Sequence, residues 1–105
     1  MDVKIGMNML LWGIQITPKH IPIFERLAAV GFDGAEVPVV GQSAAEIKAM
    51  AAACDDLGLA RTAVAFIGAD ANPISTSPSI RSAAIESLKK AIDDTVLIGA
   101  DILVG

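Results

Sequence analysis

The residues of this sequence that could carry chemistry are few and widely separated. Its one histidine, His20, has no Asp, Glu or Cys at metal-ligand spacing, so we predict a solvated or helix-capping role. Its one cysteine, Cys54, falls among apolar residues at helical spacing and is typical of a small core residue. The adjacent acids at 55–56 and 93–94 stand near the ends of predicted helices, and we interpret both pairs as surface residues. None of these positions alone defines a reaction.

Three further positions each have two interpretations. Trp12, the only tryptophan, follows an apolar extended run and either stacks on the apolar face of a ligand or packs into the core. Glu36 stands inside an apolar run, where an unpaired carboxylate is costly. It either hydrogen-bonds a substrate or is a satisfied structural acid, and we favour the structural role. Gly68 either lets the backbone approach a ligand closely or serves a turn.

Composition excludes several classes of protein. The 105 residues contain 8 Lys and Arg against 12 Asp and Glu, for a formal charge of −4. A hydrophobic content of 53% is too high for a disordered segment. An acidic chain with few aromatics and no basic cluster does not suit nucleic acid. No apolar run reaches the ~18 residues of a membrane span, and no signal peptide is visible. One cysteine fits a reducing setting, so we expect a cytoplasmic protein without a membrane or nucleic-acid partner.

Extended and helical segments alternate along the chain. The clearest helix start is the capping box from Ser43 to Glu46, in which each side chain binds a backbone N–H of the other. Glycines at 31, 58 and 99 end the three predicted helices. We place extended runs at 3–11, 34–40, 60–67 and 101–105, and helices at 17–31, 43–58 and 77–99. The start of the first helix is left open, because Pro22 follows the Thr17-Pro18 start signal. The inner face of the last helix is predicted to carry Ala84, Leu88, Ala91, Ile92 and Thr95.

This order predicts an α/β fold with a parallel sheet. Strands that alternate with helices pair in parallel through right-handed crossovers. Counted from Val3, Asp33, Ala60 and Asp101, the strand starts are separated by 30, 27 and 41 residues, compared with about 31 per unit in a (β/α)8 TIM barrel of ~250 residues. We therefore interpret residues 1–105 as the N-terminal part of one TIM-barrel domain, about its first three and a half units. The last strand would leave an open apolar edge, so we expect the natural protein to continue beyond Gly105.

Four blocks of the sequence, in chain order, resemble a known family. They are Lys4-Ile5-Gly6-Met7 leading to Trp12, Gly31-Phe32-Asp33-Gly34-Ala35-Glu36-Val37, Asp55-Asp56-Leu57-Gly58-Leu59, and a last block from Ser77-Pro78 to the run 99–105. The set resembles the xylose-isomerase-like barrels of the sugar phosphate isomerase/epimerase superfamily. Within it, the set is most similar to the D-tagatose and D-psicose (D-allulose) 3-epimerases.

The resemblance implies a metal-dependent sugar epimerase. In that family a divalent ion, commonly Mn²⁺, holds two oxygens of an open-chain ketose while two glutamates exchange a proton at C3 through an enediolate. The family's metal ligands lie on later strands of the barrel, so we expect no catalytic or metal-ligating residue in this chain and no activity from it alone. The implied partners of the whole enzyme are a small sugar and further copies of itself, as a dimer or tetramer.

The resemblance also places substrate-binding residues at the C-terminal ends of the strands. Asn8 stands where relatives often carry an aromatic residue or a histidine, and Ile16 stands about where some carry a second tryptophan. Both departures leave the sugar preference open. The residues expected to bind substrate are Asn8, Trp12, Glu36, Phe66, Gly68 and Gly105.

Two alternatives remain at this point. One is a sister activity on the same scaffold, such as hydroxypyruvate isomerase, inosose dehydratase or sugar-phosphate isomerase. The other is a small open α/β binding module of flavodoxin-like shape, which would require the chain to be complete. That second alternative is disfavoured because no glycine-rich phosphate loop follows the first strand. The DNA-repair endonuclease branch of the superfamily is disfavoured by the single histidine and the negative charge.

Overall fold

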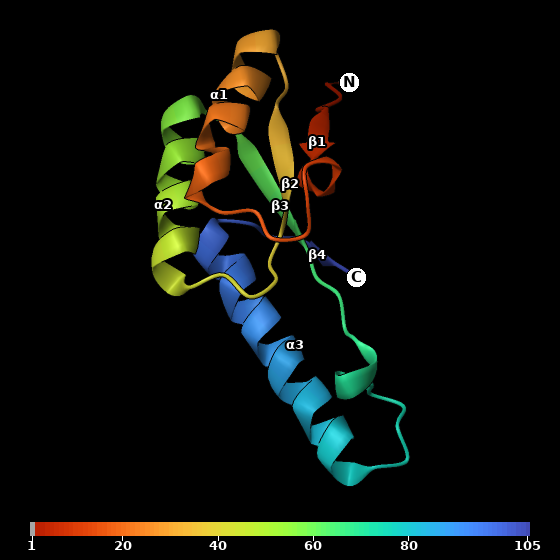
Figure 1. The fold of residues 1–105 in the computed structure, drawn as a ribbon. Coiled ribbons are helices and arrows are strands. Elements are labelled where there is room, and N and C mark those ends of the chain that lie inside the picture. Colours follow the sequence, from red (N-terminus) through yellow and green to blue (C-terminus); the bar gives the residue numbers. More distant parts are fainter. Residues whose placement is uncertain (1) are drawn as a thin grey trace.

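The computed structural model describes residues 2–105 as alternating strands and helices around one parallel sheet (Figure 1). The elements are β1 (Gly6–Asn8), α1 (Ile21–Val30), β2 (Gly34–Pro38), α2 (Ala44–Leu57), β3 (Ala60–Val64), α3 (Pro78–Ile98) and β4 (Leu103–Val104). Short 3₁₀ turns occupy Met9–Leu11, Pro18–His20 and Ala69–Ala71. The predicted α/β alternation is confirmed.

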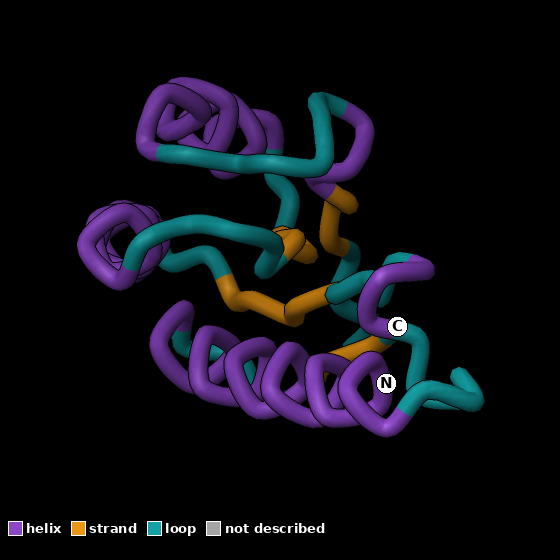
Figure 2. The backbone as a smooth tube through the Cα atoms, turned by 60° about the horizontal axis from the view of Figure 1, so that its bottom comes forward, coloured by secondary structure: helices purple, strands orange, loops and turns teal. Residues whose placement is uncertain are grey.

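The four strands lie in the order β1-β2-β3-β4, and every neighbouring pair is parallel. Figures 1 and 2 show the helices arranged along one side of the sheet, so that its other side is left open. This is the arrangement of a barrel wall, with the helices outside and the concave strand face inside. Among the described residues, no helix is long and apolar enough to cross a membrane.

The core lies between the sheet and the helices. Its largest fully buried side chains include Phe24 of α1, Ile47 and Met50 of α2, and Ile98 of α3. Cys54 is also fully buried there, and burial raises the pKa of its thiol to about 11. The prediction of a small core cysteine is therefore confirmed.

Local sequence signals correctly predicted the capping box that starts α2. Ser43 Oγ accepts from Glu46 N–H at 3.1 Å and Glu46 Oε1 accepts from Ser43 N–H at 3.0 Å, which confirms the capping box. The first helix, whose start the sequence left open, begins at Ile21, after the turn Pro18–His20. Pro22 has no N–H to donate and its ring clashes with the preceding turn, so the α-helix cannot extend far ahead of it.

The first extended run is shorter than predicted. It ends at Asn8, whose side-chain Oδ1 accepts from Leu10 N–H at 2.9 Å and caps the 3₁₀ turn Met9–Leu11. The second and third runs end at Pro38 and Val64, because the chain then turns into the loops that lead to the helices.

Two predictions about α3 were wrong. The inner face is lined as expected by Ala84, Ala91 and Thr95, but Leu88 and Ile92 are exposed. Small side chains let α3 approach its neighbours closely, and the two larger side chains lie to one side of that contact. Asp94 is buried rather than on the surface, and its charge is paired with Lys90 one helical turn earlier.

Candidate functional site

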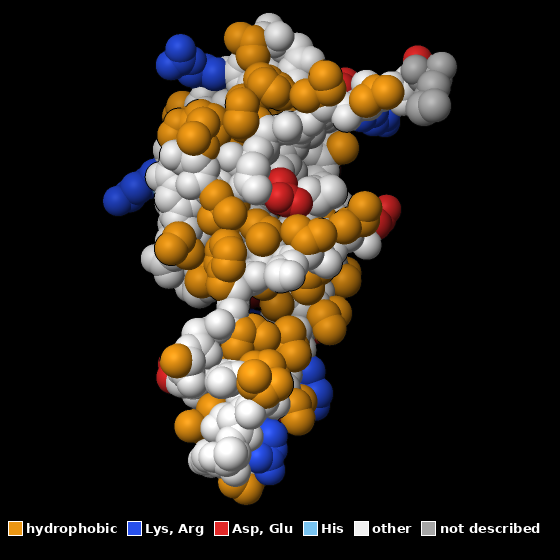
Figure 3. Space-filling model, turned by 90° about the vertical axis from the view of Figure 1, so that its right-hand side faces the viewer, with side chains coloured by type: hydrophobic (Ala, Val, Ile, Leu, Met, Phe, Trp, Pro, Cys, Tyr) orange, Lys and Arg blue, Asp and Glu red, His pale blue; other side chains and the backbone are white. Residues whose placement is uncertain are grey.

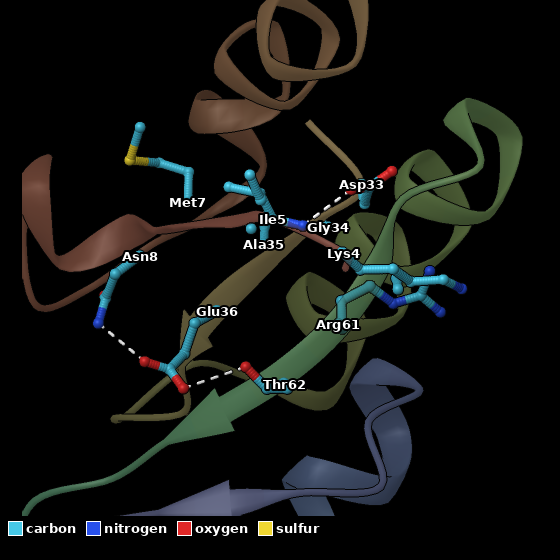
Figure 4. A pocket seen from close by; sticks show the side chains of 12 residues that line it. Lys4, Ile5, Met7, Asn8, Asp33, Gly34, Ala35, Glu36, Arg61 and Thr62 are labelled. Carbon is cyan, nitrogen blue, oxygen red and sulfur yellow. Dashed lines mark hydrogen bonds between the residues drawn. The ribbon is translucent and has the colours of Figure 1, made fainter. Parts of the chain in front are cut away.

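Three polar side chains from adjacent strands meet on the concave face of the sheet. Asn8 of β1 lies in register with Glu36 of β2, and Glu36 lies in register with Thr62 of β3. Asn8 Nδ2 donates to Glu36 Oε2 at 2.8 Å, and Thr62 Oγ1 donates to Glu36 Oε1 at 3.0 Å. Figure 4 shows the three side chains converging, while Met7 points away from them. We call these residues the Glu36 cluster.

The Glu36 cluster holds its carboxylate in a fixed orientation. Asn8 is itself anchored at both ends, because its Oδ1 accepts from Leu10 N–H and its Nδ2 donates to Glu36. This pairing also settles which end of the amide is oxygen. A carboxylate has about four acceptor positions, so two remain for donors from a ligand. The cluster is suited to accepting hydrogen bonds from hydroxyl groups.

A cavity of about 420 Å³ surrounds the Glu36 cluster. Gly34 lines its floor, and a Cβ there would lie 2.5 Å from the carbonyl oxygen of Ala60, so only glycine allows the close approach of β2 and β3. Arg61 also lines the cavity, but its guanidinium is bound to the carbonyls of Leu59 and Ile98 and to Asp55. It is therefore not free to neutralise Glu36.

The structure separates the predicted substrate-binding residues into groups. Asn8 and Glu36 line the first cavity, whereas Phe66 and Gly105 line another cavity, of about 520 Å³, beside β4. Trp12 follows the 3₁₀ turn after β1 with its side chain 40% exposed, and neither it nor Gly68 lines these two cavities. Ile16 is fully buried in the core.

Sequence reasoning missed two polar residues that shape this end of the sheet. Thr62 is the third member of the Glu36 cluster, and it becomes visible only when the register of β2 and β3 is known. Gln42 is buried in the loop after β2, where it binds three backbone groups from two loops. His20 accepts from Thr17 N–H at 3.0 Å through Nδ1, as expected of a helix-capping histidine.

The described residues do not fit a bound metal. Within residues 2–105 no group of three or more His, Cys, Asp or Glu side chains is placed to hold a metal ion. The acids of the cavity do not change this, because Asp33 accepts from Ile5 N–H at the far end of the cavity from the Glu36 cluster. We therefore derive no step through a metal from this chain.

The strand order, the parallel register and the outer helices define a class of fold: these are the first βα units of a TIM barrel, with the barrel not closed within this chain. No family model matches the sequence. Known structures of sugar epimerases do match the fold, which confirms the likeness expected from the sequence.

Three of these structures illustrate the match. D-psicose 3-epimerase with D-tagatose from Clostridium cellulolyticum H10 has 21% identity and a TM-score of 0.80, covering 96% of this chain and 36% of that one. D-allulose 3-epimerase from Methylomonas sp. in complex with D-allulose has 20% identity and a TM-score of 0.81, covering 96% and 35%. A protein of Anabaena variabilis assigned as a sugar phosphate isomerase/epimerase has 18% identity and a TM-score of 0.78, covering 98% and 37%. This chain thus spans little more than a third of the length of the structures it matches.

Proposed function

We propose that this chain is the N-terminal part of a ketose 3-epimerase-like barrel enzyme and forms one wall of its sugar pocket. The observation that carries the proposal is the Glu36 cluster on the concave face, where a fixed carboxylate offers free acceptor positions to a ligand rich in hydroxyl groups. The fold shared with D-psicose and D-allulose 3-epimerases supports it. Asn8 and Glu36 contact the sugar, and Trp12, Phe66, Gly68 and Gly105 complete the wall.

In this proposal the reacting groups are supplied by parts of the enzyme outside this chain. A divalent metal, Mn²⁺ in the first instance, would stabilise the charge that develops on the ketose oxygens during proton transfer at C3. The role of residues 2–105 is to bind and orient the sugar. Glu36, held by Asn8 and Thr62, accepts hydrogen bonds from the hydroxyl groups and so fixes their orientation.

A free sugar suits this wall better than a sugar phosphate. The carboxylate of Glu36 is bound by Asn8 and Thr62 and by no Arg or Lys among the described residues. Arg61 is already committed to Asp55 and two carbonyls, and Lys4 is the other cation that lines the cavity. A phosphate placed directly at the Glu36 cluster would therefore be repelled by a carboxylate that is not ion-paired. This favours the ketose 3-epimerase interpretation over the sugar-phosphate isomerase alternative.

The Glu36→Gln variant tests the proposed binding wall. In a titration of the ¹⁵N-labelled chain with D-psicose, we expect amide shifts at Asn8, Glu36 and Thr62, with about fivefold weaker binding in the variant. The reason is that a hydrogen bond to a charged acceptor exceeds a neutral one by roughly 1 kcal/mol, and ~1.4 kcal/mol is a factor of ten. Glu25→Gln, at an exposed position on α1, is the matched control and should bind as the unaltered chain does. Shifts that avoid the Glu36 cluster, or that survive Glu36→Gln unchanged, would contradict the proposal.

A second prediction concerns catalysis. With D-psicose and Mn²⁺, we expect the 105-residue chain to produce no D-fructose above a metal-only control, because the proposal assigns the metal ligands and the proton-transfer pair to the remainder of the enzyme. Product would be measured by chromatography over a day of incubation. Turnover above the control would show that the chain contains its own catalytic groups.

Trp12→Ala separates a sugar-contacting role from a packing role. Its side chain is 40% exposed, so truncation should lower the free energy of unfolding by only about 1 kcal/mol, near the average for point substitutions. Loss of an aromatic face from the pocket wall costs on the order of 1 kcal/mol of binding, so we expect a several-fold higher Kd for D-psicose. A fall in Tm of more than about 10 °C, well beyond that expected for about 1 kcal/mol, with an unchanged Kd would instead assign Trp12 to packing.

A further inference from the structure

One side chain connects the Glu36 cluster to the loop that follows β1. The amide of Asn8 has an acceptor end and a donor end, and both are bound. Its Oδ1 accepts from Leu10 N–H at 2.9 Å, which is the bond that asparagine characteristically makes with the backbone two residues later. Its Nδ2 donates to Glu36 Oε2 at 2.8 Å on the neighbouring strand. Figure 4 shows this second bond running from the end of β1 to the carboxylate.

The first of these bonds starts the 3₁₀ turn that places Trp12. Within the turn, Trp12 N–H donates to Met9 C=O at 3.0 Å. The Met9 side chain is fully buried, but that of Trp12 is 40% exposed, so burial fixes the first residue of the turn better than its end. Among the described residues, Asn8 is the only one whose side chain hydrogen-bonds the backbone of residues 9–13. The position of Trp12 therefore depends on the Asn8 side chain.

A single conformation of the Asn8 side chain makes both bonds. The oxygen and the nitrogen belong to one planar amide, so a rotation that breaks the bond to Glu36 also withdraws the oxygen from Leu10 N–H. The orientation of the carboxylate and the position of the turn are therefore fixed together. The other bond to Glu36, from Thr62 Oγ1, does not involve the turn. These hydrogen bonds join neighbouring strands of the sheet, so they are the same whatever segments flank β1 and β4.

We propose that Asn8 is a positioning residue that keeps the Trp12 ring and the Glu36 carboxylate at a set spacing, so that both meet one sugar molecule. The inference rests on the proposed function for its ligand, a free ketose. An aromatic ring packs against the apolar C–H face of a sugar, while a carboxylate accepts hydrogen bonds from its hydroxyl groups. Figure 3 shows the same combination on the open face of the sheet, where an acidic group lies among hydrophobic side chains. The two contacts form together only when the groups that make them are held in place.

Fluorescence tests the link without a ligand, because Trp12 is the only tryptophan and the chain has no tyrosine. Asn8→Asp keeps an oxygen for Leu10 N–H, but it replaces the donor to Glu36 with a second carboxylate that repels it. The turn should then separate from β2, and because Trp12 is 40% exposed at the outset, quenching by acrylamide should rise about twofold. Thr62→Val is the matched control, since it removes a bond to the same carboxylate without touching Asn8, and its quenching should equal that of the unaltered chain.

The double variant Asn8→Asp/Glu36→Gln restores the link with donor and acceptor exchanged. The introduced amide donates to the introduced carboxylate, and its oxygen still accepts from Thr62 Oγ1. Quenching should therefore return to the value of the unaltered chain, with helix content checked by circular dichroism. Unchanged quenching in Asn8→Asp would show that packing alone holds the turn and would overturn the proposal. If Asn8→Asp fails to fold, the double variant decides the question, because its failure to recover the signal would refute the link.

Titration with D-psicose tests the positioning role. The effect of Trp12→Ala on Kd is compared within each background, so that any direct effect of a new carboxylate on the sugar cancels. We expect a several-fold rise in Kd in the unaltered chain, in Thr62→Val and in the double variant, but a rise of less than about twofold in Asn8→Asp. An equal effect of Trp12→Ala in all four backgrounds would refute positioning by Asn8. If the unaltered chain does not bind D-psicose, it is the proposed function that fails, and the quenching results alone still establish or refute the link.

Discussion

Gln42→Ala should lower the free energy of unfolding by about 3 kcal/mol, at roughly 1 kcal/mol for each of three buried hydrogen bonds. Gln42 is 4% exposed, and its Nε2 donates to the carbonyls of Ile16 and Pro38 at 2.9 and 2.7 Å. Its Oε1 accepts from Val40 N–H at 2.7 Å. The truncation leaves all three backbone groups without their partner, and a desolvated polar group is costly.

The measurement is urea unfolding followed by circular dichroism, supported by Tm. For a domain of about 100 residues, 1 kcal/mol corresponds to roughly 4–8 °C, so Tm should fall by more than 10 °C. Gln15→Ala is the matched control, because Gln15 is exposed and should change stability by less than about 0.5 kcal/mol. Gln42→Glu should also be severe at neutral pH, since a carboxylate cannot donate to two carbonyls. Equal stability of the Gln42 and Gln15 variants would mean that the three buried hydrogen bonds do not stabilise the fold.

Gln42 also connects the fold to the candidate site. By binding Ile16, Pro38 and Val40 together, it ties the loop after β1 to the end of β2 and the loop that follows it, at the C-terminal end of the sheet. The segment that carries Trp12 is part of the first of these loops. In Gln42→Ala we therefore expect the Trp12 segment to lose its fixed position before the core unfolds, seen as faster amide exchange in residues 12–17.

The helices were predictable because their signals are local. Ser43 and Glu46 form a capping box within one turn, and Gly31, Gly58 and Gly99 end helices with left-handed φ values of 101°, 70° and 83°. The strand order followed from alternation and the right-handed crossover rule, which require no knowledge of side-chain contacts. These features depend on residues that are close in sequence.

The candidate site was only partly predictable because its contacts are long-range. Glu36 stood out in the sequence as an acid in an apolar strand, but its partners Asn8 and Thr62 are 28 and 26 residues away. Their meeting depends on a register that no local pattern fixes. Asp94 was misplaced for a related reason: it is buried beside a cavity that it lines together with Gly41 and Ala65, which are far from it in the sequence.

At the opposite end of the sheet, Arg61→Met should lower the free energy of unfolding by about 3 kcal/mol, because hydrogen bonds from a charged donor contribute roughly 1.5–3 kcal/mol each. The Arg61 side chain is only 9% exposed. Its Nε donates to Ile98 C=O at 2.8 Å, its Nη1 to Leu59 C=O at 2.7 Å, and its Nη2 to Asp55 Oδ1 at 2.6 Å. It thereby joins the end of α3 to the start of β3.

Single substitutions separate the contribution of the Asp55 carboxylate from that of the two backbone carbonyls that Arg61 binds. Asp55 is 67% exposed, so Asp55→Ala should cost less than about 1 kcal/mol, as exposed ion pairs do. Arg61→Lys keeps the charge but has no planar fork of donors, so it should recover only part of the loss. If Asp55→Ala is as damaging as Arg61→Met, then the ion pair, and not the pair of carbonyl hydrogen bonds, holds this end of the sheet together.

Gly99 supplies an independent check on the position of the Arg61 guanidinium. A Cβ at Gly99 would clash with Arg61 Nη2, and the φ of +83° disfavours any side chain there. Gly99→Ala should therefore destabilise the unaltered chain through both effects, but the Arg61→Met background through φ strain alone. The double-mutant cycle should give a coupling of at least ~0.5 kcal/mol, with the two losses summing to more than the double variant loses. Strict additivity in urea unfolding would mean that the guanidinium does not lie over Gly99 in solution, and the assignment of Arg61 as the bond between α3 and β3 would fall with it.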